Sequence, residues 1–172
     1  KGLSNGFPLS ALAGKRYLME QFENENCFMS GSYATEKASL KAALKTIEIL
    51  QKGEAIRHIW EMGEMLREGI EEIISKQALS EVLRIVGLAP MTHLIISDQE
   101  DATVNEIKSF IQQECAKKGV LFVGYHHTSL GHTREDIEYT LEVYNDVFSR
   151  MRKALTDKTL KDNTEGRVIS AF

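Results

Sequence analysis

Apolar residues recur at spacings of three and four along two long stretches of the chain, which predicts two long amphipathic helices. The first stretch runs from Glu54 to about Lys76 and the second from Thr133 to about Leu155, with Thr133 and Asp136 at capping-box spacing at its start. A third helix is expected from Glu36 to Lys52, where small apolar residues form one side and Thr35 suits the N-cap. Gly53 then ends this helix and separates it from the first long one.

Short apolar runs between the two long helices predict strands at Leu83 to Val86, Thr92 to Ile96 and Val120 to Val123. A further helix is expected after Thr103, because Thr103 and Glu106 have capping-box spacing and Gly119 suits a left-handed stop. Gly124 to His132 is expected to form a polar turn. This order of elements predicts an α+β unit, in which helices cover a sheet of three or four strands.

The two ends of the chain have weaker patterns. In Lys1 to Pro8, two glycines and a proline predict a tight loop. A short extended piece from Leu9 to Ala13 and a short helix from Lys15 to Phe22 should follow it. From Thr156 on the chain is polar until its last few residues, which predicts an extended arm or a disordered end.

Composition narrows the expected partners and compartment. With 21 basic and 25 acidic residues the formal net charge is −4, which argues against nucleic acid or an anionic membrane as partner. Cys27 and Cys115 lie far apart, which argues against a disulfide framework or a zinc site and fits a reducing cytoplasm. No apolar run approaches the roughly 18 residues of a membrane span. The N-terminus lacks the order of charged and then apolar residues that a signal peptide has, so we expect a soluble cytoplasmic protein.

Lys1, at the mouth of the glycine-rich loop, is the first candidate for chemistry. A lysine amine whose charge is removed by burial or by neighbouring positive charge can attack a carbonyl carbon. Spacing alone favours the other interpretation, a lysine exposed to water. A second candidate is the segment from Ser30 to Tyr33, whose small hydroxylic residues directly precede a predicted helix and could seat an anion.

Three segments of the chain have sequence patterns that occur together in one enzyme family. The first is Lys1-x-x-x-x-Gly6-x-Pro8, which is followed by a small-residue strand. The second is Ser30-Gly31-Ser32-Tyr33 with the helix after it, and the third is Thr128 to Ile137. In this order they resemble the class III aminotransferases, which depend on pyridoxal 5'-phosphate, and in particular glutamate-1-semialdehyde 2,1-aminomutase and related transaminases.

The resemblance implies an α/β fold, that of the fold-type I pyridoxal-phosphate transferases. Residues 1–53 would be the C-terminal end of the large cofactor-binding domain, including an interdomain helix. Residues 54–155 would be the α+β C-terminal small domain, and residues 156–172 a tail. The other cofactor-binding parts would precede Lys1, so the chain is expected to be a fragment that binds pyridoxal phosphate weakly by itself.

The resemblance also implies roles for individual residues. The lysine that opens the first segment forms the internal aldimine in the family and carries the proton transfer, and Lys1 matches it. A threonine of the second segment reaches the cofactor phosphate across a subunit interface in relatives. Ser32 stands in its place and keeps the hydroxyl, and Gly31 beside it is expected to bind the cofactor together with Ser32 and Lys1. A homodimer is therefore implied, with Ser32 reaching the neighbouring subunit's site.

The loop before the third segment departs from the aminomutase pattern. Where aminomutases of this group have an acidic residue, this chain has Gly124 and Tyr125 followed by two histidines, which favours an ordinary transaminase. Tyr125 and His126 are candidates for substrate contact. Adjacent histidines at a strand end point to opposite faces, and no cysteine or carboxylate lies at ligand spacing, so no metal site is expected.

Several functions remain open on this evidence. The first is part of an aminotransferase that moves an amino group from a small-molecule donor to a carbonyl acceptor through a lysine aldimine. The second is an aminomutase, which is an isomerase. A non-catalytic α+β module, an inactive fragment, or part of a fused sugar-modifying enzyme on the same scaffold are the others. The sequence names neither the amino donor nor the acceptor.

Overall fold

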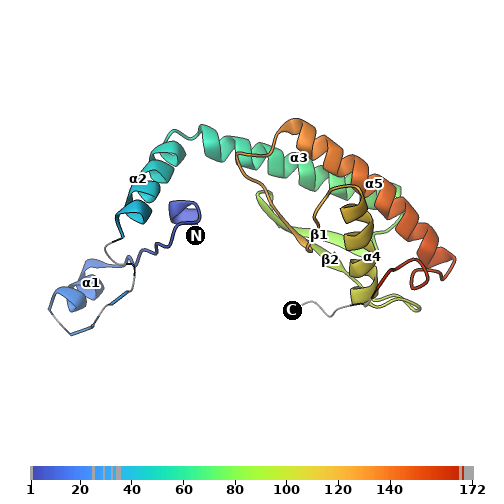
Figure 1. Ribbon diagram of the computed structural model, residues 1–172, viewed down its shortest axis with the longest axis horizontal. Helices are drawn as coiled ribbons and strands as arrows, with labels where there is room; N and C mark the ends of the chain where they lie inside the picture. Colours follow the sequence, from blue (N-terminus) through green and yellow to red (C-terminus); the bar gives the residue numbers. More distant parts are fainter. Residues whose placement is uncertain are drawn as a thin grey trace. The chain divides into compact units, whose positions relative to one another are not determined.

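The computed structural model describes residues 2–24, 26–28, 30–31, 33, 36–166 and 168. Its helices are η1 Gly2–Ser4, α1 Arg16–Glu23, α2 Lys37–Gln51, α3 Glu54–Lys76, α4 Val104–Lys117 and α5 Arg134–Thr156 (Figure 1). Its strands are β1 Leu83–Leu88, β2 Met91–Ile96 and β3 Tyr125–His127. The chain divides into two compact units, Lys1–Ile56 and Arg57–Phe172.

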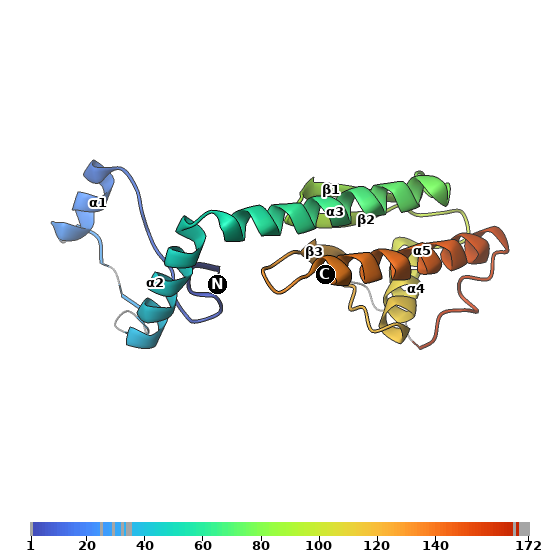
Figure 2. The same cartoon turned by 90° about the horizontal axis from the view of Figure 1, so that it is seen from above.

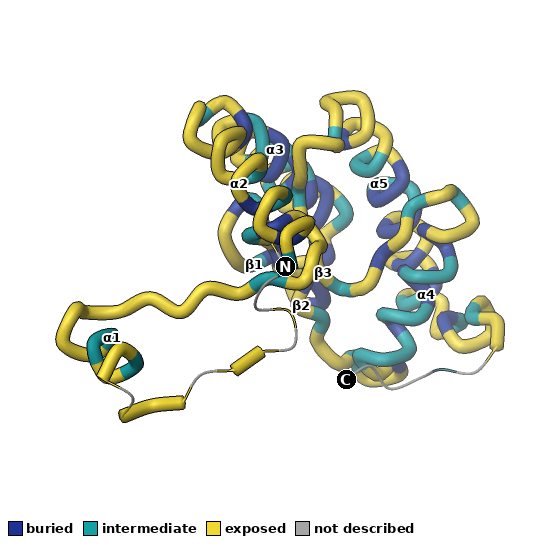
Figure 3. The backbone as a smooth tube through the Cα atoms, turned by 60° about the vertical axis from the view of Figure 1, so that its left-hand side comes forward, coloured by how far each residue is buried: buried dark blue, intermediate teal, exposed yellow. Residues whose placement is uncertain are grey.

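The N-terminal unit buries few side chains. Its buried described residues are Ser4, Ser39, Ala43 and Ala55, and most of its backbone is coloured as exposed in Figure 3. The one-turn helix η1 packs against α2, whose Ser39 and Ala43 form the buried side. The expected short helix is present as α1, although none of its residues is buried. Local hydrogen bonds therefore hold this unit more than a core does.

The C-terminal unit is built on an antiparallel sheet of three strands in the order β1-β2-β3. Ala89 and Pro90 form the turn between β1 and β2, where Leu88 pairs with Met91. Alternate strand residues, among them Leu83, Ile85, Thr92 and Leu94, are buried on one face of the sheet. The predicted small α+β sheet is thereby confirmed, because its burial alternates with the two-residue period of a half-covered sheet.

Helices α3 and α5 lie side by side in both Figure 1 and Figure 2 and form the core together with α4 and the sheet. Ile70, Phe110, Ile111, Val147 and Phe148 are each no more than 2% exposed. Full burial of such side chains contributes about 1.5–3 kcal/mol each. Among the described residues, no helix is both long and apolar enough to cross a membrane.

The third strand lies elsewhere than predicted. Val120 to Val123 forms no strand, and β3 is Tyr125–His127, inside the segment expected to be a polar turn. The left-handed Gly119 (φ +75°) turns the chain out of α4, and the Val120 N–H is bonded to the Cys115 carbonyl. Pairing with β2 begins only when the Gly124 carbonyl accepts from Leu94 N–H at 3.0 Å. The apolar run therefore signalled the burial of Phe122, and not strand pairing.

Helix caps follow the sequence signals in two of three cases. Thr103 with Glu106 and Thr133 with Asp136 form the predicted capping boxes of α4 and α5. The cap of α2 differs, because Glu36 is its N-cap and accepts hydrogen bonds from the helix. The predicted cap Thr35 lies outside the described residues.

The expectation of an extended or disordered end after residue 156 is wrong for residues 157–166. Leu160 is 3% exposed and joins the core beside α4 and α5. Lys161 pairs with Glu106 at 3.3 Å, and Gln113 donates to the Asn163 carbonyl at 3.0 Å. One apolar side chain and polar contacts with Glu106 and Gln113 of α4 hold this segment on that helix.

Candidate functional site

The two residues with the strongest predicted roles, Lys1 and Ser32, lie outside the described residues. Gly31, which precedes Ser32, is described and exposed, and a Cβ added there would meet no atom within 4 Å. The same holds for Gly2, which follows Lys1. The structure therefore describes only chain neighbours of the two predicted cofactor residues, and the roles of Lys1 and Ser32 stay predictions.

The loop directly after Lys1 is a closed turn, as predicted. Asn5 N–H donates to the Gly2 carbonyl at 3.4 Å, and Phe7 N–H donates to the Ser4 carbonyl at 3.3 Å. The fully buried Ser4 hydroxyl donates to the Phe7 carbonyl. Asn5 (φ +49°) and Gly6 (φ +100°) are both left-handed, a conformation that a β-branched residue would not accept at low cost. These bonds fix the direction of the chain next to Lys1.

The first turn of α2 is occupied by a carboxylate of the chain itself. Glu36 accepts hydrogen bonds from Ala38 N–H and Ser39 N–H. Hydrogen bonds from Ser39 hold the pKa of the Glu36 carboxyl below its ordinary value. The expected anion seat ahead of this helix is therefore not supplied by the N–H groups of its first turn.

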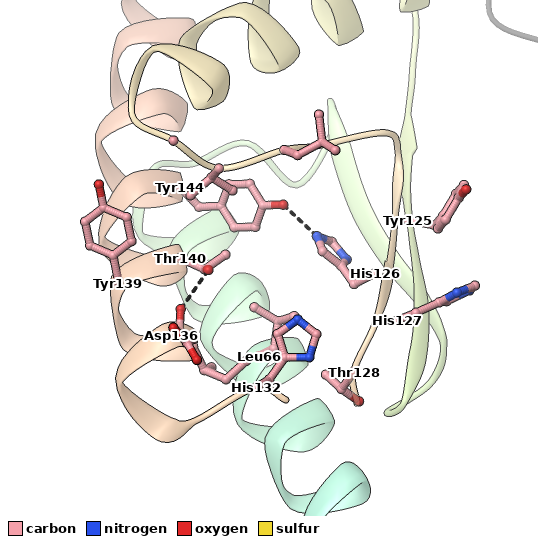
Figure 4. A pocket seen from close by; sticks show the side chains of 14 residues that line it. Leu66, Tyr125, His126, His127, Thr128, His132, Asp136, Tyr139, Thr140 and Tyr144 are labelled. Atoms are coloured by element: carbon pink, nitrogen blue, oxygen red, sulfur yellow. Dashed lines mark hydrogen bonds between the residues drawn. The ribbon is translucent and has the colours of Figure 1, made fainter. Parts of the chain in front are cut away.

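The C-terminal unit contains a cavity of about 400 Å³. It opens between β3, the loop on each side of it and the first turns of α5 (Figure 4). Its lining residues are Leu66, Gly119, Val120, Leu121, Tyr125, His126, His127, Thr128, His132, Asp136, Ile137, Tyr139, Thr140 and Tyr144. The mixture of apolar walls and a few polar groups is typical of small-molecule pockets.

His126 points from β3 toward the interior and has both ring nitrogens bonded. Nδ1 lies 3.0 Å from the Thr92 hydroxyl, and Nε2 lies 2.6 Å from the Tyr144 hydroxyl (Figure 4). Burial, and after it the charges of His93 and His127, lower the pKa of His126 to about 4. Burial likewise raises the pKa of Tyr144. The imidazole is therefore neutral and the phenol protonated at neutral pH.

Tyr125 and His127 point away from His126, as the alternation of a strand requires (Figure 4). Both are exposed, and their ring centroids lie 5.0 Å apart. His93 on β2 lies next to them, 5.9 Å from the ring of Tyr125. No cluster of three metal-ligating side chains occurs within the described ranges. Substrate contact by Tyr125 or His126 stays a prediction.

His132 fixes the loop before α5 through hydrogen bonds of its ring and its carbonyl. Its Nδ1 accepts from Ser129 N–H at 3.0 Å, and its carbonyl accepts from His58 Nε2 at 2.8 Å. The Thr128 hydroxyl donates to the Ile59 carbonyl at 2.9 Å, which ties the same loop to α3. The sequence reasoning missed Thr92 and Tyr144 as members of a polar network, because both occupy positions that the apolar pattern assigns to the core.

A family profile described as "Aminotransferase class-III" matches residues 1–155. Among curated proteins, the chain is 23% identical over 157 residues to 3-aminobutyryl-CoA aminotransferase of Cloacimonas acidaminovorans (strain Evry), covering 90% of this chain and 37% of that protein. It is 24% identical over 189 residues to glutamate-1-semialdehyde 2,1-aminomutase of Natronomonas pharaonis, covering 86% of this chain and 41% of that protein.

Solved structures are also similar to this chain. The internal aldimine form of the FumI protein of Sphingopyxis sp. MTA144 with PLP superposes with a TM-score of 0.77 at 27% identity, over 90% of this chain and 36% of that one. An omega-transaminase from Sphaerobacter thermophilus, at 14% identity and a TM-score of 0.75, covers 87% and 37% and shows likeness of fold alone. The chain thus spans about two-fifths of the length of the curated relatives it matches.

Proposed function

Because the chain belongs to the class III aminotransferase family, we propose that it is part of a pyridoxal-phosphate-dependent enzyme that transfers an amino group from a small-molecule donor to a carbonyl acceptor. The observation that carries the proposal is the family match over residues 1–155, which includes all three segments of the sequence resemblance. The name of one curated relative, 3-aminobutyryl-CoA aminotransferase, supports the same reaction class.

The chemistry of the available side chains fits the cofactor. Lys1 offers a primary amine for the cofactor's carbonyl carbon, and Ser32 offers a hydroxyl donor for its phosphate. A Cβ added at Gly2 or at Gly31, the described neighbours of these two residues, would meet no atom within 4 Å. The chemistry that bound pyridoxal phosphate supplies is an electron sink for a carbanion.

The protein's contribution is then binding and proton transfer. Lys1 Nζ would hold the cofactor's carbonyl carbon and later take the proton from the substrate Cα. The closed turn from Gly2 to Phe7 would keep the backbone of the lysine in place during both roles. Ser32 Oγ would hold the phosphate with a hydrogen bond to an anion, which is about twice as strong as one between neutral groups.

An aminomutase is the second candidate, because several of the relatives are named glutamate-1-semialdehyde 2,1-aminomutase, at 24–28% identity. Such an enzyme moves the amino group within one molecule, so it needs no separate donor. Product formation from glutamate-1-semialdehyde without added amino donor separates the two candidates. An absolute requirement for a donor supports the aminotransferase.

Replacement of Lys1 by alanine tests the proposal. The variant is made in a protein that contains this chain and has the full length of its relatives. We expect the variant to lose amino transfer by several orders of magnitude, because both covalent holding and proton transfer depend on the amine. Borohydride reduction followed by peptide mass spectrometry should place the trapped cofactor on Lys1. Full activity of the variant, or a label elsewhere, would exclude the role.

Lys15→Ala is the matched control, since Lys15 is an exposed lysine at the start of α1. It should retain both activity and the label on Lys1. The 172-residue chain gives a further comparison. It is expected to bind the cofactor weakly, and stoichiometric binding by this chain would contradict that part of the proposal.

We also propose a homodimer in which Ser32 of one subunit serves the site that holds Lys1 of the other. Mixing Lys1→Ala with Ser32→Ala subunits tests this arrangement. If the site is shared, random reassociation makes about half of the dimers mixed, and one of the two sites in each mixed dimer has both an intact Lys1 and an intact Ser32. About a quarter of all sites are therefore restored. Sites built within one subunit would give no recovery. Subunit mass from light scattering must show a dimer in both parents.

A further inference from the structure

We propose that Ser39 and Ala43, two small residues on one side of α2, are positioning residues for Lys1. Their small size lets the turn that follows Lys1 pack closely on α2, and this packing sets the place of the lysine amine. The inference rests on the proposed function, because that function gives the amine its roles. It goes further by naming residues of another helix that act on the reaction only through Lys1.

Small side chains make the contact between η1 and α2. The two helices pack against each other, and η1 lies beside α2 in both Figure 1 and Figure 2. Of their described residues, Ser4 on η1 and Ser39 and Ala43 on α2 are buried, each no more than 5% exposed. Ser39 and Ala43 are four positions apart and therefore lie on the same side of the helix. The buried side chains of the two helices thus meet in this contact.

The larger apolar residues of α2 lie outside this contact. Leu40, Leu44 and Ile47 are 45%, 67% and 38% exposed. Protein interiors are close-packed, so a larger side chain at a buried position moves a neighbour or leaves its preferred rotamer. The distance between η1 and α2 therefore depends on the size of residues 39 and 43.

The turn that packs on α2 resists internal deformation. Asn5 N–H donates to the Gly2 carbonyl at 3.4 Å, and Phe7 N–H donates to the Ser4 carbonyl at 3.3 Å. The Ser4 hydroxyl also donates to the Phe7 carbonyl. Asn5 and Gly6 are both left-handed, a region in which few other conformations are allowed. A larger side chain on α2 would therefore shift the turn as a unit.

The start of α2 is held in place independently of η1. Glu36, its N-cap, accepts hydrogen bonds from Ala38 N–H and Ser39 N–H. Capping by a side chain satisfies backbone donors that have no partner within the helix. Because the first turn of α2 is fixed in this way, an enlarged residue should displace η1 and leave the start of α2 where it is.

A displaced turn would carry Lys1 with it. Gly2 is the first residue of η1 and follows Lys1 directly in the chain. In the proposed reaction the lysine amine must reach both the carbonyl carbon of the cofactor and the proton on the substrate Cα. A misplacement of about 1 Å can lower a rate by about a hundredfold. The size of residues 39 and 43 should therefore affect kcat more than substrate binding.

Ala43→Leu tests the inference in the full-length protein used for Lys1→Ala. At saturating pyridoxal phosphate, kcat should fall by about ten- to hundredfold, whereas KM should stay within about twofold. Hydrogen exchange of the protein without cofactor gives a second measurement, in which the peptide from Gly2 to Phe7 should exchange several-fold faster. Unchanged kcat would overturn the positioning role, and unchanged exchange would overturn the contact.

Two control variants separate position from stability. Ala38→Leu makes the same change on the exposed side of α2, so kcat and exchange should stay as in the wild type. Ala43→Gly weakens the helix without adding volume, so it should lower thermal stability but keep kcat. An equal loss of kcat in Ala43→Gly and Ala43→Leu would overturn positioning, because helix stability would then explain both.

Ser39→Leu keeps the inference testable if Ala43→Leu does not fold. It enlarges the other buried residue and should lower kcat and speed exchange in the same way, and wild-type values in the folded variant would overturn the role of this side of α2. Lys1→Ala separates the two proposals. Full activity of Lys1→Ala would refute the proposed function and this role with it. An inactive Lys1→Ala beside a fully active Ala43→Leu would refute the positioning role alone.

Discussion

At the residue scale, His126 makes the stability of the protein depend on pH. Its pKa is about 4 in the folded protein, against about 6.5 in an unfolded chain. Between these values the unfolded state binds more protons, so stability rises with pH. The contribution is complete above about pH 6.5 and is lost as the pH falls toward 4, by about 3 kcal/mol at most.

Urea unfolding between pH 4 and pH 7 measures this dependence. His126→Gln should flatten most of the slope between pH 4 and pH 6.5, because the buried titrating group is gone. His127→Gln on the exposed side of β3 should keep most of it, since burial is the largest cause of the shift. Equal slopes in wild type and His126→Gln would show that the ring is not buried in the neutral form.

Glu114 offers a second residue-scale prediction. Its side chain is 2% exposed and pairs with Arg150 and with Lys117, the latter at 3.0 Å. Burial would raise the pKa of Glu114, but hydrogen bonds from Gln113 and Lys117 and the Arg150 charge lower it overall. Its contribution to stability is therefore present above its unfolded pKa and is lost as the pH falls.

Replacement of Glu114 by glutamine should lower the free energy of unfolding by about 1–3 kcal/mol, because two cations lose a buried partner but can still reach water. Glu165→Gln is the matched control. Glu165 pairs with the same Lys117 at 2.7 Å but is 76% exposed, so its loss should cost less than about 1 kcal/mol. Chemical unfolding at neutral pH measures the free energy of unfolding of both variants. Equal losses would contradict the importance of the burial of Glu114.

At the element scale, two glycines of α3 should respond differently to alanine. A Cβ at Gly63 would lie 2.3 Å from the Ala89 carbonyl oxygen, which belongs to the backbone of the β1–β2 turn. A Cβ at Gly69 would lie 2.5 Å from the side chain of Leu141, which can rotate. Alanine improves helix propensity by about 1 kcal/mol at both sites, so the neighbours decide the outcome.

Gly63→Ala should therefore destabilise the protein by several kcal/mol, since overpacking against backbone forces α3 and the sheet apart. Gly69→Ala should change the stability by less than about half of the loss caused by Gly63→Ala, because the Leu141 side chain can rotate away. Thermal unfolding followed by circular dichroism compares the two. A Gly63→Ala variant as stable as Gly69→Ala would mean that the contact between α3 and the turn is looser than described.

Sequence signals predicted the elements whose causes are local. The bounds of α3 and the capping boxes of α4 and α5 follow from residues within a turn or two of each other. The position of β3 did not follow, because the partner strand β2 determines where pairing starts. The same limit applies to the cavity. His126 meets Thr92 and Tyr144 across 34 and 18 positions of sequence, which no periodicity reveals.

At the scale of the whole molecule, the two units differ in how they are stabilised. Helix α2 buries only Ser39 and Ala43, whereas α5 buries seven side chains, Phe148 and Met151 among them. Isolated helices shorter than about 12–15 residues are marginal in water, and most helical stability comes from packing. The C-terminal unit should therefore unfold as a cooperative whole, and α2 should open locally.

Hydrogen exchange of the 172-residue chain tests this difference between two helices of one molecule. Amides of α5 should exchange with the free energy of global unfolding, about 5–15 kcal/mol, and those of α2 with about 0–2 kcal/mol. A second copy of the chain that covered α2 would protect it by mass action, so that protection would rise with protein concentration. Protection of α2 equal to that of α5 at every concentration would contradict the division into two independently stabilised units. A rise with concentration would instead support the proposed homodimer, because the C-terminal unit already has its own core and needs no partner for its protection.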